Sequence, residues 1–360
     1  MERGRGGEKP PSTKGGGNKG FEGFIISITT LMSVESAIDL LERRCCYCGA
    51  CIAICPVSAL DLGEEGPVLN REKCTNCGLC TKICPTLNVA EALKAESIVL
   101  ESYTARSTKS DVLEVCQDGG VVTSLLLTAL ERKMIDAAIV TTSKPSEPLK
   151  PIPVIAEDSE TIIKSAGSKY SLSPLLHLLR RAISTYRRLA VVGLPCHIRA
   201  LWLMKSTGLR KYTDPVKLTI GLFCMNNYPY SGIVNALRTH IGVEPDDVTR
   251  IDIKRGMFIV RLKQGYEKSI KVSVLKKYAT YSCRSCPDLT SWMADLSVGS
   301  IGSEDGWSTV LVRTNVGREL IKYAIDTGII VAKKLDKEGL EVINKLSERK
   351  KRRLRITSPH

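Results

Sequence analysis

The strongest constraint on this chain is a set of eight cysteines in its first quarter. Cysteines that are two residues apart on a tight loop can bind three corners of one [4Fe–4S] cluster. Zinc also binds paired cysteines, but a zinc site needs neither four cysteines in each run nor a Cys-Pro ending. The spacing therefore predicts two iron–sulfur clusters. The two runs are Cys45-x2-Cys48-x2-Cys51-x3-Cys55-Pro56 and Cys74-x2-Cys77-x2-Cys80-x3-Cys84-Pro85.

The two runs also predict which cysteines share a cluster. In two-cluster ferredoxins, the fourth cysteine of each run ligates the cluster of the other run. We therefore expect an N-terminal α+β ferredoxin domain of the bacterial type. Cys46 is off the spacing and is expected to be a small packed thiol. The expected ligand sets are Cys45, Cys48, Cys51 and Cys84 for one cluster, and Cys74, Cys77, Cys80 and Cys55 for the other.

The length and cysteine content indicate more than a ferredoxin. A chain of 360 residues has room for about two or three domains. No apolar run approaches the roughly 20 residues of a membrane-spanning helix, so no membrane span is expected, and peripheral association stays open. Disulfide-rich secreted proteins are usually much smaller. The 14 cysteines therefore favour metal ligation in a reducing cytoplasm.

Most of the net charge of +14 lies at the two ends of the chain. Residues 1–20 carry a net charge of +3, and residues 345–360 carry a net charge of +6. Basic tails can bind nucleic acid or an acidic partner. Neither base-stacking aromatic residues nor a helix-turn-helix pattern accompanies them. We therefore expect solvated tails, or contact with an acidic partner or substrate, and no nucleic-acid partner.

Composition and periodicity divide the chain into four segments. After the cysteine runs, alternating strand and helix signals predict an α/β body. The strand signals between Ile251 and Val274 are close together, so we expect a mixed sheet. The expected segments are 1–31 (disordered or an extension), 32–95 (ferredoxin domain, opening with a helix at 33–44), 96–335 (α/β body) and 336–360 (C-terminal helix and basic tail).

The expected elements of the body can be given by residue range. Strands are predicted at 97–104, 136–142, 188–193, 216–223, 249–254, 257–263, 269–274 and 307–313. Helices are predicted at 120–132, 158–165, 173–186, 196–206, 231–241, 316–327 and 337–352.

Four cysteines of the body suggest a second site. Cys196 and Cys224 each follow a predicted strand, where α/β proteins gather their ligand sites. Cys283 and Cys286 form a C-x2-C loop that could complete a four-thiolate site. Simple packing, a redox disulfide or part of a zinc site are the alternatives. From the residues alone, a third cluster is only one of these options.

The motifs around these cysteines resemble the beta-subunit family of coenzyme F(420)-reducing hydrogenase and F(420) dehydrogenases. Together they cover roughly residues 100–330 in the order found in that family. The segments that carry the resemblance are Gln117-Asp118-Gly119-Gly120-Val121-Val122-Thr123-Ser124, Ser165-Ala166-Gly167-Ser168-Lys169-Tyr170, Gly193-Leu194-Pro195-Cys196, Ile220-Gly221-Leu222-Phe223-Cys224, Cys283-Arg284-Ser285-Cys286-Pro287-Asp288, Ala294-Asp295-Leu296-Ser297-Val298-Gly299-Ser300 and Asp305-Gly306-Trp307-Ser308-Thr309.

The resemblance implies a mixed-sheet flavin domain with FAD, one [4Fe–4S] cluster and coenzyme F(420) as substrate. It assigns the third cluster to Cys196, Cys224, Cys283 and Cys286, and leaves Cys116 as a packed residue. Two polar segments are candidates for the flavin site, because a Gly pair at a helix start and a Ser-Lys-Tyr sequence suit a phosphate or a ring edge. A helix cap and a solvated loop are the plain alternatives. The candidate residues are Asp118, Gly119, Gly120, Thr123, Ser168, Lys169 and Tyr170.

The implied function is a conversion between hydride transfer and single-electron transfer. A deazaflavin exchanges two electrons at once and a cluster exchanges one, so a flavin is needed between them. The resemblance therefore predicts an oxidoreductase subunit that works with a partner redox subunit or a ferredoxin. Two rival hypotheses are an FAD and iron–sulfur module that does not use F(420), and a polyferredoxin-like relay without enzymatic activity.

Overall fold

The computed structural model describes residues 37–41, 44–64, 66–94 and 96–354. The expectations for residues 1–31, and for the start of the helix at 33–44, lie outside these residues. The described part of that helix is α1 (Ala37–Leu41). The chain divides into Met1–Ser33 and a second unit, Val34–His360, which contains every described residue.

The N-terminal module, residues 37–94, repeats one local geometry in both cysteine runs. Helices α2 (Ala50–Ile54) and α3 (Leu79–Lys82) each follow a glycine, Gly49 or Gly78, with φ of 79° and 70°. A glycine suits this left-handed conformation because it has no Cβ. The hairpin of β1 (Leu60–Leu62) and β2 (Pro67–Leu69), with helix α4 (Val89–Leu93), completes the module.

The body, residues 96–354, is built on an eight-stranded mixed sheet with the order β13-β3-β12-β11-β7-β6-β4-β5. The neighbouring strands β11, β7, β6 and β4 are parallel, and the strands on both sides of them are antiparallel. The prediction of a mixed α/β fold is therefore confirmed. The strands are β3 (Glu101–Ser107), β4 (Ala137–Lys144), β5 (Glu147–Ala156), β6 (Leu189–Gly193), β7 (Val216–Leu222), β11 (Leu296–Gly299), β12 (Ser308–Val312) and β13 (Ile330–Lys334).

The strands predicted between residues 249 and 274 are not the reason why the large sheet is mixed, so that part of the prediction was wrong. They form a separate antiparallel sheet of β8 (Val248–Lys254), β9 (Met257–Leu262) and β10 (Glu267–Lys271). The last of them ends at Lys271, and the 3-10 helix η4 (Val272–Tyr278) follows. The antiparallel pairs of the large sheet come instead from its outer strands.

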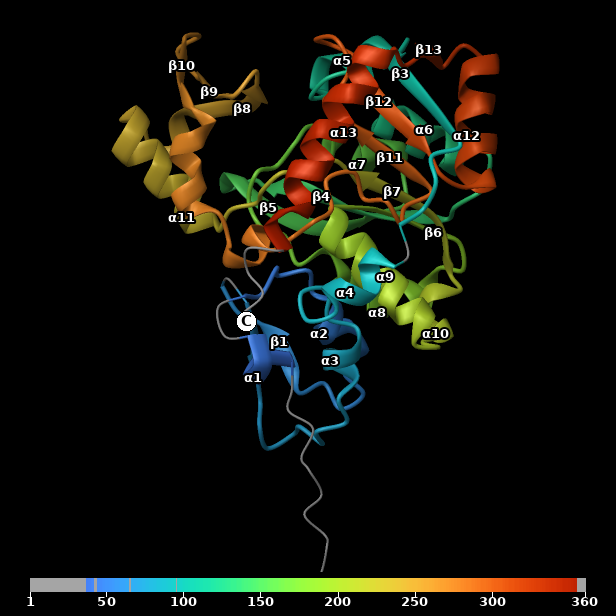
Figure 1. Ribbon diagram of the computed structural model, residues 1–360, viewed down its shortest axis with the longest axis vertical. Helices are drawn as coiled ribbons and strands as arrows, with labels where there is room; N and C mark the ends of the chain where they lie inside the picture. The colour runs from blue at the N-terminus through green and yellow to red at the C-terminus, as the bar shows by residue number, and fades with distance from the viewer. Residues whose placement is uncertain (1–36, 42–43, 65, 95, 355–360) are drawn as a thin grey trace, which may run out of the picture. The chain divides into compact units, whose positions relative to one another are not determined.

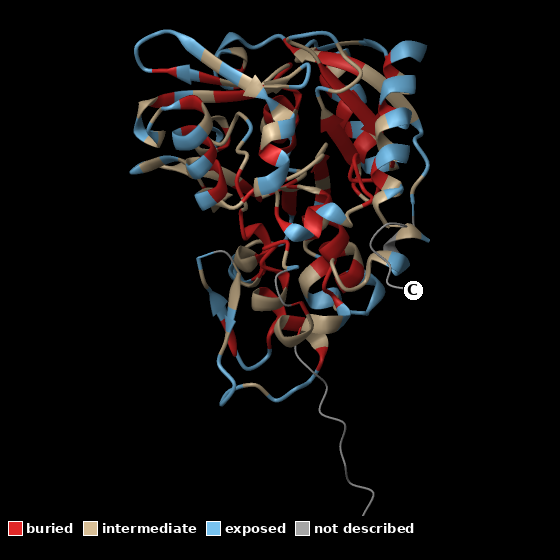
Figure 2. Ribbon diagram, turned by 60° about the vertical axis from the view of Figure 1, so that its left-hand side comes forward, coloured by how far each residue is buried: buried red, intermediate tan, exposed pale blue. Residues whose placement is uncertain are grey.

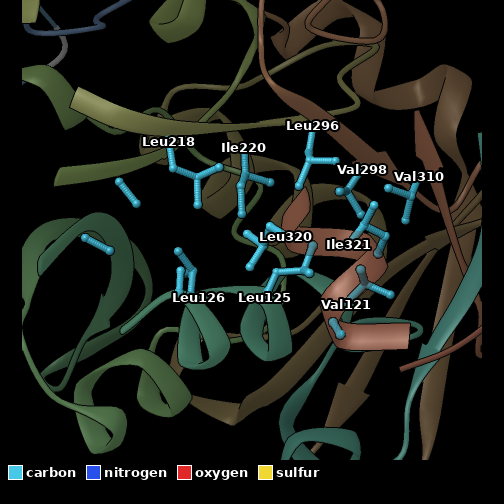
Figure 3. Close-up of a cluster of buried hydrophobic side chains, with 14 of the residues drawn as sticks. Val121, Leu125, Leu126, Leu218, Ile220, Leu296, Val298, Val310, Leu320 and Ile321 are labelled. Atoms are coloured by element: carbon cyan, nitrogen blue, oxygen red, sulfur yellow. The ribbon is translucent and has the colours of Figure 1, made fainter. Parts of the chain in front are cut away.

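Helices cover both faces of the large sheet. On one face lie α6 (Val121–Glu131) and α12 (Asn315–Asp326), whose apolar side chains meet those of β7, β11 and β12 (Figure 3). On the other face, α8 (Leu179–Thr185) and α9 (Pro195–Ser206) pack against β4 and β6. The central strands are consequently buried on both sides, as Figure 2 shows.

Several expected helices are interrupted, and some elements were missed. The helix expected at 173–186 begins with the 3-10 helix η1 (Leu175–Leu178), and α11 (Tyr230–Ala236) continues as the π-helix η2 (Leu237–Ile241). Strand β5 was not predicted, because it contains three prolines. Proline is tolerated in β5 because this strand lies at the edge of the sheet.

The other helices of the described residues, predicted or not, complete the body. They are α5 (Ser110–Val115), α7 (Ser159–Lys164), α10 (Arg210–Thr213), η3 (Pro245–Asp247), η5 (Tyr281–Arg284) and α13 (Lys337–Lys351).

The N-terminal module shares its hydrophobic core with the body. Ala50, Ala53 and Ile54 of α2 belong to the same buried cluster as residues of α8, α9 and β6. The N–H of Leu176 donates a 2.9 Å hydrogen bond to the carbonyl of Cys48. A Cβ on Gly49 would lie 2.6 Å from the backbone atoms Pro174 O and His177 N of the body. A side chain at this position would therefore push the N-terminal module away from the body. The cysteine-bearing helices are therefore held directly against the body.

No helix in the part of the chain that the structure describes is long and apolar enough to span a bilayer.

Candidate redox site

Two of the body cysteines reach the same edge of the large sheet. Strand β6 ends at Gly193, and Cys196 lies in the first turn of α9, where Pro195 suits the first helical position. Strand β7 is parallel to β6 and ends at Leu222, two residues before Cys224. Parallel strands end at the same edge of a sheet, so the two thiols come from adjacent positions.

A loop that runs alongside β7 brings the other two body cysteines to this edge. The N–H of Cys224 donates to the carbonyl of Leu289 at 2.8 Å, and the Ser291 hydroxyl donates to the carbonyl of Leu222 at 3.0 Å. A Cβ on Gly221 would lie 2.2 Å from the Cβ of Ser291. The missing side chain of Gly221 therefore permits the close approach that positions Cys286.

The four body thiols interact electrostatically with one another. Burial raises the pKa of Cys283 to about 12, with further contributions from Cys224 and Cys286. The neighbouring Cys46 thiol and burial raise the pKa of Cys196, and the Cys224 and Cys286 thiols raise it further. The structure therefore brings all four predicted body ligands together.

One cavity in the N-terminal module is lined by four predicted ligands from both runs. Burial raises the pKa of Cys45 and that of Cys84 to about 12. Cys51 interacts electrostatically with both of these thiols. The cysteines that line the cavity are Cys45, Cys46, Cys48, Cys51 and Cys84.

The other predicted ligand set is more open to solvent. Cys55 packs with Cys74 and Cys80 in a small apolar cluster. Cys77 is exposed, unlike the cysteines that line the first cavity. This second set therefore lies nearer the surface of the module than the first.

The donor chemistry of these sites fits iron–sulfur clusters. Backbone N–H groups donate to the sulfur atoms of Cys45, Cys55 and Cys80 at 3.2–3.3 Å, as expected for thiolate ligands. In the body, the N–H of Asn227 donates to Cys283 Sγ at 3.3 Å. Among the described residues, no group of three or more His, Cys, Asp or Glu side chains could hold a single metal ion. The ligands of a cubane need not converge on one ion, because each binds a different iron atom.

Two residues that the sequence had not assigned to a cluster lie between the body site and the N-terminal module. Cys46 is buried, as expected of a packed thiol, in one cluster with Cys48 and Cys196, and these two thiols lower its pKa. Arg199 is also buried, and it donates to the carbonyl of Pro85 at 3.2 Å and to Cys286 Sγ at 3.8 Å. Its position three residues after Cys196 in α9 could have indicated that it lies on the same helix face.

The candidate flavin segments lie beside each other and beside β8. The Ser168 N–H donates to Gln117 Oε1 at 3.1 Å, and the Gln117 side-chain amide donates to Asp252. Lys254 forms a 3.0 Å ion pair with Asp118. The structure therefore brings the 117–120 and 168–170 segments together although about 50 residues separate them in the sequence.

The glycine pair in this region is required by main-chain packing. A Cβ on Gly119 would lie 2.5 Å from the carbonyl oxygen of Ala105 and 2.7 Å from the N atom of Ser308. Gly120, the residue that precedes α6, has φ of 70°, and Thr123 is buried in the first turn of the helix. These three residues are needed for backbone conformation and packing. The polar residues Asp118 and Ser168 therefore form the more open part of the candidate flavin site.

Lys169 and Tyr170 are also tied to the protein. The Lys169 ammonium donates to the carbonyls of Ser165, Ala166 and Gly167 at 2.6–3.0 Å, so it caps the end of α7. Burial lowers its pKa to about 8. The Tyr170 hydroxyl accepts a 3.3 Å hydrogen bond from the N–H of Ile253. Both side chains therefore stabilise the wall of the candidate flavin site.

Cysteine sites of this kind on an α/β body define a class of iron–sulfur oxidoreductase subunits, and three family models match the chain. Two of them describe the two halves of the family "Coenzyme F420 hydrogenase/dehydrogenase, beta subunit". The model of its C-terminal half matches residues 186–338, and the model of its N-terminal half matches residues 102–180. Residues 44–88 match a "4Fe-4S dicluster domain".

Curated and solved proteins show the same similarity. The beta subunit of the coenzyme F420 hydrogenase of Methanococcus voltae is 35% identical over 255 residues, which cover 69% of this chain and 90% of that protein. One of the subunits of the F(420)H(2) dehydrogenase of Methanosarcina mazei is 31% identical over 319 residues, which cover 86% of this chain and 89% of that protein. A chain of the F420-reducing [NiFe] hydrogenase complex from Methanosarcina barkeri aligns with a TM-score of 0.70 and 32% identity, covering 72% of this chain and 91% of that chain.

The chain therefore belongs to the coenzyme F(420) hydrogenase/dehydrogenase beta-subunit family, as the sequence motifs predicted. It is an oxidoreductase with an N-terminal 4Fe–4S dicluster domain, so iron–sulfur clusters are among its cofactors.

Proposed function

We propose that this chain exchanges a hydride with coenzyme F(420) and exchanges single electrons with a partner redox subunit or ferredoxin. The observation that carries the proposal is the junction at Cys46, a buried thiol that packs in one cluster with Cys48 of the N-terminal module and Cys196 of the body. Electron transfer becomes much slower with distance. Two cysteine sites that share a neighbour can therefore work in series.

The three cysteine sets would hold three [4Fe–4S] clusters, which supply one-electron transfer. FAD bound between the 117–120 and 168–170 segments would supply the conversion between hydride transfer and one-electron transfer. Asp118 and Ser168 offer polar groups to it, while Gly119, Gly120, Thr123, Lys169 and Tyr170 keep the wall of the site rigid. Such a site is preorganised, so binding costs little ordering of the protein.

The proposed order of the sites follows from their burial. The body cysteines are adjacent to the first set of the N-terminal module, and Cys77 of the second set is exposed. A redox partner would therefore reach the second set most easily. At the other end, Lys254, Arg250 and the exposed Arg255 lie near Asp118, each in an ion pair with a carboxylate. We propose that the phosphate and glutamate groups of F(420) exchange with these carboxylates as partners of the cations.

The test is an anaerobic absorption spectrum of the purified protein before and after addition of reduced F(420). We expect loss of the flavin band together with loss of the broad iron–sulfur absorbance. A flavin that does not respond would refute F(420) as the substrate and favour a module of another redox complex. Absence of flavin would favour the polyferredoxin-like relay.

An iron count tests the body site separately. Three cubanes correspond to about twelve iron atoms per chain, whereas zinc at the body site leaves about eight. Cys196→Ser should lose about four of the twelve iron atoms. Cys116→Ser is the matched control, because Cys116 is also buried but donates to the carbonyl of Asp118 away from the cysteine sets.

A further inference from the structure

The C-terminal helix α13 packs along the outside of the large sheet and ends at the body cysteine site. Ile343 and Leu340 contact Leu311 of β12 and the segment that follows β7. Figure 1 shows its last turns pointing from the large sheet toward the N-terminal module. The family match ends at residue 338, so it covers only the first two residues of this helix.

Lys350, in the last turn of α13, is almost completely buried. The residue is 1% exposed, although it lies in the predicted helix 337–352 at the basic end of the chain, for which we expected solvation or contact with an acidic partner or substrate. The ammonium donates to the carbonyl of Asp288 at 2.6 Å and to the carbonyl of Cys224. A buried ammonium is costly unless carbonyl dipoles and negative charges surround it. The expectation of a solvated tail was therefore wrong for this residue.

Arg353 extends the same contact to the other side of the cysteine site. Its guanidinium donates to the carbonyls of Cys283 and Met225 at 2.9 and 3.0 Å. Lys350 and Arg353 together bond to the backbone at Cys224, Cys283 and Asp288. One helix end thus holds both cysteine-bearing segments, which lie about 60 residues apart in the sequence.

The charges around the site are complementary. The four thiolates of a cubane give it a net negative charge, and net charge and hydrogen bonds to sulfur set its potential. Two buried cations face these thiols, Lys350 from α13 and Arg199 from α9. Arg199 donates to Cys286 Sγ at 3.8 Å, and the Lys350 ammonium is bonded to the carbonyls of Cys224 and Asp288, which flank the site. The two cations therefore lie where they can offset the negative charge of a thiolate-bound cluster.

We propose that the C-terminal turn is a positioning element of the body cluster site, in which Lys350 and Arg353 hold the Cys224 and Cys283–Cys286 segments and Lys350 supplies a counter-charge that raises the reduction potential. This inference rests on the proposed [4Fe–4S] cluster at Cys196, Cys224, Cys283 and Cys286. It does not depend on F(420) or FAD.

The test uses the full-length protein with the variants Lys350→Met, Lys350→Arg and Arg353→Met. Lys345→Met is the matched control, because Lys345 lies on the exposed side of the same helix. Iron is counted per chain, and the clusters are titrated with a chemical reductant and followed by electron paramagnetic resonance. The clusters of the N-terminal module serve as an internal reference for the potentials.

Two results would support the proposal. K350M either loses about four iron atoms per chain or keeps them with a more negative potential of the body cluster alone. K350R should restore part of the potential because it keeps the charge, and K345M should match the wild type. R353M, which retains Lys350, should lose part of the body iron, and the body clusters that remain should keep the wild-type potential. This variant tests positioning if K350M does not fold.

Other results would overturn it. If K350M and R353M keep all iron and every potential, neither residue positions or tunes the cluster. If the wild type holds only about eight iron atoms, the body cluster itself is absent. A failure of reduced F(420) to bleach the protein, with iron and potentials behaving as expected, would refute the proposed substrate and leave this inference standing.

Discussion

Substitution of Gly221 by alanine should disturb the body cysteine site and little else. The new Cβ would lie 2.2 Å from the Cβ of Ser291 and 2.9 Å from that of Ala294. Carbon atoms in contact are normally about 3.5–4.0 Å apart, so the two segments must separate by more than about 1 Å. Neither side yields easily, because Gly221 lies in the central strand β7 and Ser291 is fully buried.

The magnitude follows from this overlap. Overpacking of a core costs about 1–3 kcal/mol, and an overlap between two Cβ atoms near the backbone belongs at the upper end. A loss of about 3 kcal/mol corresponds to a fall of roughly 4 °C in Tm for a chain of this size, because the unfolding entropy is about 2.1 cal/mol/K per residue. The separation also strains the bond from the Cys224 N–H to Leu289, so we expect loss of about four iron atoms per chain.

Thermal unfolding and an iron count on the same preparations measure both effects. Gly66→Ala is the control, because a Cβ at Gly66 meets nothing within 4 Å and this glycine does not have a positive φ. G66A should keep the Tm within about 1 °C. Equal Tm and iron content in G221A and the wild type would refute the packing argument.

Two further predictions concern the docking of the N-terminal module and the wall of the candidate flavin site. The Arg180 guanidinium donates to Ala53, Ser58 and Cys55, so Arg180→Ala should destabilise the docked module by about 1.5–3 kcal/mol, measured by denaturant unfolding. Arg181→Ala, at the exposed neighbouring position, should change little, and equal midpoints in both variants would contradict a docking role. Burial lowers the pKa of Lys169 to about 8, below the roughly 10.4 of an unfolded lysine, so the unfolded chain binds more protons between these values. The free energy of unfolding of the wild type, measured in urea, should therefore rise over this pH range relative to that of Lys169→Met. The same pH dependence in both proteins would contradict a lowered pKa of Lys169.

Much of the fold could be predicted from the sequence, because the patterns that indicate strands and helices are local. Strand β6 is apolar and almost wholly buried, so a continuous hydrophobic run predicted it, whereas β7 alternates apolar residues with Lys217 and Thr219. The strand β5 was missed because its prolines are permitted only by its edge position, which is a property of the whole sheet. The three strands after residue 248 were found, but their assignment to a separate sheet depends on long-range pairing.

The candidate cysteine sites were also predicted from spacing and motifs, whereas their surroundings were not. The predicted FAD contacts remain a prediction, and the structure gives Gly119 and Lys169 packing and capping roles that no local pattern indicated. Arg199 could have been suspected from its spacing to Cys196. Nothing near Lys350 in the sequence distinguishes it from the other lysines and arginines of a basic tail.

The candidate ligands could be read from the amino-acid sequence, because a cluster needs particular residue types at short, fixed spacings. The family and the alternation of strands and helices were readable in the same way. The position of Cys46 between two cysteine sites, and the burial of Lys350 beside the body cysteines, became visible only in the folded chain. Burial and charge pairing depend on contacts between segments far apart in the chain, and these contacts leave no periodic pattern in the sequence.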